Sequence, residues 1–133
     1  MDYEIILENE WGIVRYEPEH KYIYHTFLKD VNGKDVQHIL NVGLETLEKY
    51  EAIKWLSDDR KNGPVWQEDI DFSLNDWGPR AAAAGWKYWA LVVPDEVIGR
   101  ASMIDVVDAY FQLGVRVQTF TDLETAKKWL LKF

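Results

Sequence analysis

The most apolar stretch of the chain is YWALVV at residues 88–93, which completes a predicted strand that begins at Trp86. A half-exposed strand alternates apolar and polar residues, whereas this stretch is apolar at every position. Such a continuous run is expected where both faces of a sheet are covered, as in the parallel sheets of α/β proteins. The stretch therefore predicts an internal strand of a covered sheet.

The residues that follow this strand alternate between helix and strand signals. Ser102 with Asp105, and Thr121 with Glu124, resemble capping boxes that open two helices. A strand over residues 115–120 separates the two helices. Alternating strands and helices imply right-handed crossovers, so this part of the sheet is expected to be largely parallel.

The residues that precede it begin with three predicted strands, over residues 3–8, 11–16 and 22–28. Their short connections favour an antiparallel meander. An apolar stripe then predicts a helix that opens at Lys34 or Asp35 and ends at Tyr50. The remaining elements are a short strand over residues 52–56 and a polar segment with a helical middle over residues 63–85.

Together these elements predict one α/β domain that spans residues 1–133. The N-terminal meander forms an antiparallel edge of a mixed β-sheet, and βαβ units form the rest. About four helices are expected to cover the sheet.

The composition excludes several classes of function. The chain has 15 Lys plus Arg against 23 Asp plus Glu, a net charge of −8, and no cysteine. Without cysteine there is no disulfide, thiolate catalysis or Cys-ligated metal. The acidic balance argues against nucleic acid or an anionic membrane surface as the main partner. No apolar run approaches a membrane span, and the start lacks a basic leader, so we expect a cytoplasmic protein without membrane contact.

Common catalytic and cofactor motifs are missing from the sequence. No glycine-rich dinucleotide motif, Walker loop, nucleophile elbow or H-E-x-x-H pattern occurs. The spacing of His20, His25 and His38 matches no familiar metal site. His25 lies in the middle of a predicted strand, where it is expected to be buried and hydrogen-bonded. We therefore expect no metal and no cofactor.

Carboxylates are dense in the middle of the chain, where they have two interpretations. The carboxylates concerned are Asp58, Asp59, Glu68, Asp69, Asp71 and Asp76. Asp58 and Asp59 follow a strand, where α/β folds place ligands and where oxygen atoms could bind a hard cation. Acids that open a helix are also stabilised by its dipole alone, and this interpretation is favoured for the later ones. Arg60 is expected to pair with the preceding aspartates, and Arg80 to reach solvent or pair with a carboxylate, with anion binding as a secondary role.

Tryptophan is the most unusual component of the sequence. Five of the seven tryptophans lie between positions 55 and 89: Trp55, Trp66, Trp77, Trp86 and Trp89. Trp66 and Trp77 are eleven residues apart, so they would share one face of a continuous helix. They stand among acidic residues and near prolines, where packing inside the protein and an oligomer or ligand surface are both open.

Four stretches of the chain carry a family resemblance: WLSDDR at 55–60, WGPRA at 77–81, WALVVP at 89–94 and FTDLETAKKWL at 120–130. They resemble the SpoIIAA-like group of the STAS domain superfamily, which includes small bacterial proteins of unknown function. The resemblance implies a SpoIIAA-like fold and a non-catalytic role in binding partner proteins or small ligands. The related Sec14-type fold of lipid-transfer proteins adds an apolar ligand as an alternative.

Some members of that superfamily are switched by phosphorylation of a serine in an Asp-Ser-(Ser or Ala)-Gly motif. This motif is missing here, and the nearest hydroxyls belong to Ser57 and Ser73.

Three hypotheses follow. The first is a non-catalytic protein–protein interaction module, acting as a homodimer through the surface around residues 57–77. The second is a small-ligand pocket at the carboxyl ends of the strands, near Ser57, Asp58, Arg60 and Arg80. The third and weakest is an enzyme that uses Asp58 and Asp59, because adjacent residues seldom converge on one substrate atom.

Overall fold

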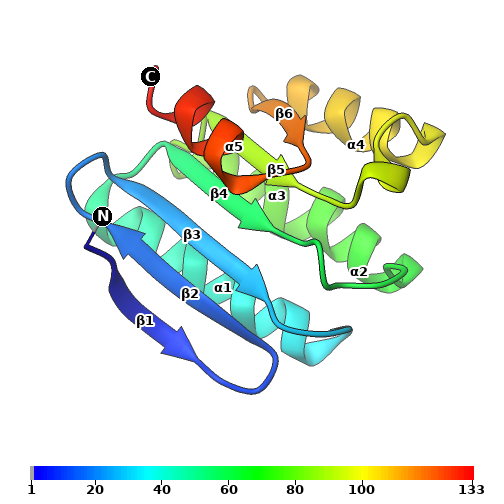
Figure 1. Ribbon diagram of the computed structural model, residues 1–133, viewed down its shortest axis with the longest axis horizontal. Coiled ribbons are helices and arrows are strands. Elements are labelled where there is room, and N and C mark those ends of the chain that lie inside the picture. Colours follow the sequence, from blue (N-terminus) through cyan, green and yellow to red (C-terminus); the bar gives the residue numbers. More distant parts are fainter. Residues whose placement is uncertain (1) are drawn as a thin grey trace.

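A computed structural model describes residues 2–133 and contains one six-stranded sheet (Figure 1). The strands lie in the sheet in the order in which they occur along the chain. They are β1 (Glu4–Glu8), β2 (Gly12–Glu17), β3 (Tyr22–Phe27), β4 (Lys54–Asp58), β5 (Tyr88–Val92) and β6 (Arg116–Phe120).

The pairing of the strands changes in the middle of the sheet. β1, β2 and β3 form an antiparallel meander, and β3 to β6 are parallel. Parallel neighbours need a crossover, which helices supply here. The crossover helices are α1 (Lys34–Tyr50), the run α2 (Gln67–Phe72), η1 (Ser73–Trp77) and α3 (Gly78–Ala83), and then η2 (Asp95–Val97) with α4 (Ala101–Gln112). The mixed α/β architecture predicted from the sequence is confirmed.

The two faces of the sheet are covered by different helices. The last helix, α5 (Leu123–Leu130), lies in front of β4 and β5 in Figure 1, whereas α1 and α3 lie behind the sheet. Two separate clusters of buried side chains reflect this arrangement. One joins the sheet to α1, α3 and α4, and the other joins it to α5. Both faces of β4 and β5 are therefore covered, as the apolar run at residues 88–93 indicates.

Alternation along β4 divides its side chains between these two clusters. Trp55 belongs to the cluster under α1 and α3, whereas Leu56 belongs to the cluster under α5. Because successive side chains of a strand point to opposite faces, Ser57 lies on the same face of the sheet as Trp55, and Asp58 lies on the same face as Leu56. All five residues of β4 are buried, including its polar ones.

The helical run between β4 and β5 corrects the expectation for Trp66 and Trp77. Trp66 precedes α2 with an extended backbone and is 55% exposed, whereas Trp77 is 3% exposed. Residues 73–77 form a π-helical segment, whose wider turn changes the position of Trp77, its last residue, around the helix axis. The two indoles therefore do not share a face.

The helix starts near the C-terminus also differ from the predicted capping boxes. The cap of α5 is Asp122, whose carboxylate accepts a hydrogen bond from the Thr125 backbone N–H at 2.9 Å. The predicted box of Thr121 with Glu124 is therefore wrong: the cap lies one residue later, where the aspartate side chain accepts from one of the free N–H groups at the helix start. Arg100 precedes α4 without a side-chain cap, so the predicted box at Ser102 is wrong.

Helix α1 approaches the sheet closely through a glycine. A Cβ atom on Gly43 would lie 2.2 Å from Cη2 of Trp55, so only glycine leaves room for this ring. The contact holds the Trp55 indole against the sheet, in the same cluster as Trp77 and Trp86.

None of the helices within residues 2–133 is both long and apolar enough to cross a membrane.

Candidate functional site

A cavity of about 170 Å³ lies at the carboxyl ends of β3, β4 and β5. It lies on the face of the sheet that bears α1, α2 and α4, and no residue of α5 is among its described lining residues. Strand register explains its floor: His25 of β3 pairs with Ser57 of β4, and Ser57 pairs with Leu91 of β5. These three side chains form one row across the sheet at the strand ends, and all three line the cavity.

The lining is mainly apolar and aromatic, with a small number of polar groups. The aromatic residues are Phe27, Trp55, Trp77, Trp86, Trp89 and Tyr110. The polar side chains are His25, Ser57, Asp59, Asn62, Asp69 and Ser73. No lysine or arginine is among the described lining residues. This combination of apolar walls and few polar groups is typical of small-molecule sites.

His25 is the centre of a hydrogen-bond network at the base of the cavity. The Trp55 indole N–H donates to His25 Nδ1 at 2.9 Å, and His25 Nε2 lies 2.8 Å from Asp59 Oδ1. An indole N–H can only donate, so Nδ1 must accept and the proton of the neutral ring lies on Nε2. His25 therefore donates to Asp59 and is fixed in one orientation. The expectation of a buried, hydrogen-bonded His25 is confirmed, since the residue is 2% exposed.

Ser57, His25 and Asp59 resemble the residues of a catalytic triad, but the geometry does not favour that chemistry. Ser57 Oγ lies 3.4 Å from His25 Nδ1, and the lone pair of Nδ1 already accepts from Trp55 at 2.9 Å. A general base needs a free lone pair within reach of the nucleophile's proton. The network is thus built to hold side chains in place.

The four tryptophans of the cavity all use their N–H groups within the protein. Besides the Trp55 bond, Trp89 donates to Ser57 Oγ at 2.8 Å. Trp77 and Trp86 donate to the backbone carbonyls of Leu40 and Tyr88 at 2.8 and 3.0 Å. A molecule in the cavity therefore meets ring carbon atoms of these indoles, and its polar partners must be other groups.

Asp69 is a buried carboxylate of the cavity wall. It is 2% exposed, and both oxygens lie 3.0 Å from the backbone nitrogen of Gly33, which precedes α1. This single N–H is the only hydrogen-bond donor that the described residues give to the carboxylate, and no described cation pairs with it. The positive end of the α1 dipole lies nearby and stabilises the negative charge in part.

A hydroxyl pair forms another polar point of the wall. Tyr110 of α4 donates to the Ser73 carbonyl at 3.1 Å, and its hydroxyl oxygen is hydrogen-bonded to Ser73 Oγ. Burial raises the pKa of Tyr110 to about 12, although the hydrogen bond with Ser73 acts in the opposite direction. Tyr110 is therefore a neutral hydroxyl across the physiological range.

Asp58 and Arg60 lie apart from the cavity. Asp58 points toward the α5 side, and its carboxylate accepts two hydrogen bonds from the Arg60 guanidinium at 2.9 Å. Burial alone would raise the pKa of Asp58, but the hydrogen bonds and charge of Arg60 hold it below its usual value. The predicted ion pair is present, and neighbouring Asp58 and Asp59 face different surroundings.

Arg80 and Trp66 also lie outside the cavity lining. Arg80 donates to Asp76 Oδ1 at 2.9 Å and to Asn41 Oδ1 at 3.1 Å on the surface of α3 and α1. The carboxylate pairing expected for Arg80 is therefore observed. Of the predicted site residues, the cavity brings together Ser57, Asp59 and Trp77.

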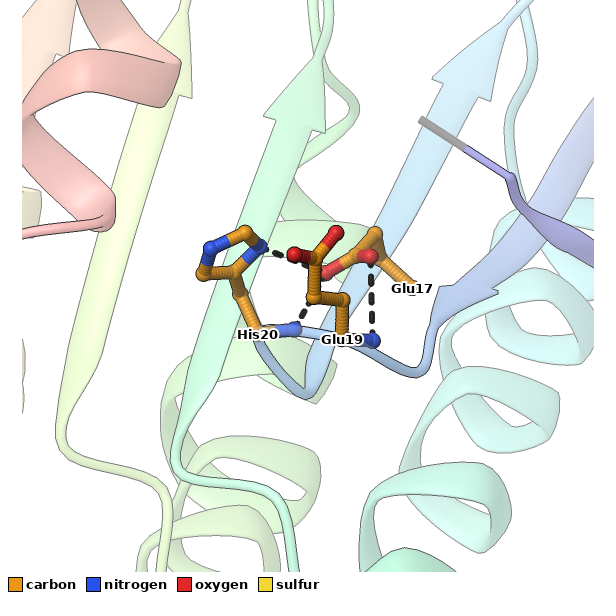
Figure 2. Close-up of side chains that lie close together, drawn as sticks. All are labelled: Glu17, Glu19 and His20. Carbon is orange, nitrogen blue, oxygen red and sulfur yellow. Dashed lines mark hydrogen bonds and ion pairs between the residues drawn. The ribbon is translucent and has the colours of Figure 1, made fainter.

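A separate cluster of possible metal ligands lies in the turn between β2 and β3, where Glu17, Glu19 and His20 approach one another (Figure 2). The Glu17 carboxylate accepts from the backbone nitrogens of Glu19 and His20 at 3.0 and 2.6 Å, and His20 Nδ1 lies 3.3 Å from Glu17 Oε2. The two hydrogen bonds from backbone nitrogens tie the turn together. The buried Glu17 is thereby explained without a metal.

Sequence reasoning missed the roles of His25 and Asp69 in the cavity. His25 has a detectable signal: alternation along β3 places it on the same face as Ile23 and Phe27, which are buried under α1. The sequence pattern predicts only that Asp69 is an acid in the first turn of a helix. Its contact with Gly33, a residue 36 positions away, depends on the tertiary structure.

Comparison of the chain with protein-family models, curated proteins and solved structures finds no match. The resemblance to the SpoIIAA-like group therefore stays a prediction.

Proposed function

We propose that this chain is a non-catalytic binding module that takes a small, mainly apolar organic molecule into the cavity beside Trp55 and His25. The observation that carries the proposal is the cavity itself, at the carboxyl ends of three parallel strands. Ligands of open α/β sheets usually bind at that edge. A SpoIIAA-like, ligand-binding member of the STAS superfamily fits this proposal.

The size of the cavity supports a ligand of about one ring. An engineered cavity of about 150 Å³ lined by apolar side chains binds benzene. The present cavity is of similar volume, about 170 Å³, and is smaller than the roughly 300–1,000 Å³ of pockets for drug-sized molecules.

The state of the polar groups supports binding over catalysis. His25 already accepts from Trp55 and donates to Asp59. Asp58 and Asp59 do not converge, since one pairs with Arg60 and the other with His25. Fixed groups of this kind orient a ligand without an activated nucleophile or base.

Titration with benzyl alcohol tests the proposal, with tryptophan fluorescence and calorimetry as readouts. We expect saturable binding to the wild type. Val106→Phe, which adds a ring to the cavity wall, should weaken the affinity at least tenfold. Ile104→Phe is the matched control on the same helix, because Ile104 is 53% exposed and does not line the cavity.

Equal affinities in the two variants would contradict the proposal, and so would a wild type that binds neither benzyl alcohol nor its charged analogues benzylammonium and benzoate. Circular dichroism of each variant checks that the fold is retained.

A second candidate function is self-association as a homodimer. Val65 and Trp66, directly before α2, are 52% and 55% exposed, and exposed tryptophan is enriched in binding hot spots. Sedimentation velocity over a range of concentrations should then show a dimer that Trp66→Ala weakens. A monomer at every concentration would refute this candidate.

A further inference from the structure

We propose that the molecule bound in this cavity is a small organic cation, with an ammonium group that pairs with Asp69 and an apolar body against the tryptophans. This inference rests on the proposed binding function and adds the charge of the ligand. It begins from the carboxylate of Asp69, which is 2% exposed and lines the cavity.

A buried carboxylate normally has several hydrogen-bond donors or a cationic partner, because an ion loses its hydration when it is buried. An ionised carboxylate offers about four acceptor positions. Asp69 receives one backbone N–H, from Gly33, and has no ion pair within residues 2–133. The cavity is where the missing positive charge can come from.

The other polar groups of the cavity favour the same sign of charge. Asp59 adds a second carboxylate, and its described side-chain partner is His25. Within residues 2–133 no lysine or arginine lines this cavity, and Arg60, close in sequence, is engaged with Asp58 on the α5 side. An anionic ligand would therefore meet two negative charges and no compensating cation.

The aromatic lining adds to this preference. The negative faces of indole and phenol rings attract cations, and the attraction grows when water is excluded. Since the indole N–H groups of Trp55 and Trp89 are used within the protein, these rings offer no donor that would favour an anion. The chemistry fits a one-ring arylalkylammonium ion or an alkylammonium ion of similar size.

The test uses three probes of nearly equal shape at pH 7: benzylammonium, benzyl alcohol and benzoate. Calorimetric titration of the full chain should rank benzylammonium first, at least tenfold tighter than benzyl alcohol, with benzoate weakest. Asp69→Asn keeps an acceptor for Gly33 but removes the charge, so it should abolish the preference for the cation while benzyl alcohol still binds.

Asp71→Asn is the matched control, because Asp71 is an exposed carboxylate on the same helix that hydrogen-bonds to Gln67 and does not line the cavity. It should bind all three probes like the wild type. Benzyl alcohol or benzoate binding as tightly as benzylammonium would overturn the charge assignment and leave the proposed function standing.

A cation preference that survives in Asp69→Asn would overturn the role of Asp69. Absence of binding by all three probes would overturn the proposed function, and this inference with it.

Discussion

The two faces of the sheet differ in how completely their side chains fill the space under the helices. On the α5 face, Leu56 and Ala90 pack against Ala126 and Leu130 in a closed cluster, and all four are fully buried. On the opposite face, the larger aromatic side chains pack against α1, α3 and α4 and leave a cavity of about 170 Å³ at the strand ends. One face is filled, and the other holds a cavity with mainly apolar walls and a few polar groups.

The difference is informative because both faces are built from the same strands. In β4, Trp55 and Ser57 face the cavity side, and Leu56 and Asp58 face α5. The charged residue on the closed side has its counter-ion in Arg60, whereas Asp69 on the open side has none among the described residues. Stability is thus expected to depend most on one face, and ligand binding on the other.

The largest expected effect is a difference in stability between two Leu→Ala variants in neighbouring strands. Leu56 is fully buried on the closed face, and Leu91 is 3% exposed beside the cavity. Leu56→Ala should lower the free energy of unfolding by about 3–5 kcal/mol, and Leu91→Ala by about 2 kcal/mol, because Leu91 already lacks neighbours on one side. Urea denaturation measures both. Equal losses would mean that the two faces are equally well packed.

A smaller difference in stability is expected when a side chain is enlarged on each face of the sheet. Ala90 is fully buried on the closed face, so Ala90→Leu should cost about 1–3 kcal/mol through overpacking. Val106 lines the cavity, so Val106→Leu should change stability by less than about 0.5 kcal/mol. Thermal denaturation of the two variants gives the comparison. Destabilisation by Val106→Leu as large as that by Ala90→Leu would show that the cavity cannot accept volume.

The smallest expected effect concerns the paired charge of the closed face. The pKa of Asp58 is lower in the folded protein than in the unfolded chain, so the folded state binds fewer protons there. Its contribution, on the order of 1 kcal/mol, is present above about pH 4 and is lost as the pH falls through the folded pKa.

Urea denaturation between pH 7 and pH 3 measures this contribution. Asp58→Asn should be less stable than the wild type at pH 7, and the gap should narrow as the pH falls to 3. A constant gap would mean that the charge of Asp58 does not contribute.

Much of the fold follows from the sequence, because periodicity reports local burial directly. The apolar run at residues 88–93 predicts a strand covered on both faces, and β5 is such a strand. The stripe that predicts α1 also gives its bounds closely, since the helix spans Lys34–Tyr50. Trp66 lies just outside the helix with an extended backbone, and the π-helical segment that ends at Trp77 leaves no periodic signal, so the separation of the two indoles is not predictable from the sequence.

The location of the cavity at the strand ends is predictable from the sequence, but most of the residues that line it are not. The sequence predicts a pocket at the strand ends near Ser57, Asp58, Arg60 and Arg80. Of these four residues only Ser57 lines the cavity, together with the neighbouring Asp59. His25 reaches Asp59 across 34 positions, and Asp69 reaches Gly33 across 36. Such pairs depend on the register of β3 with β4 and on the docking of α2 against α1, which no local motif encodes.

The most direct test of the account is the position of benzylammonium on the protein, read from the indole N–H resonances of its seven tryptophans. Titration followed by ¹H–¹⁵N correlation spectra should shift the resonances of the four cavity tryptophans, which are Trp55, Trp77, Trp86 and Trp89. The account predicts that the resonances of Trp11, Trp66 and Trp129 stay in place. Shifts confined to these three, or no shift at any tryptophan, would contradict it.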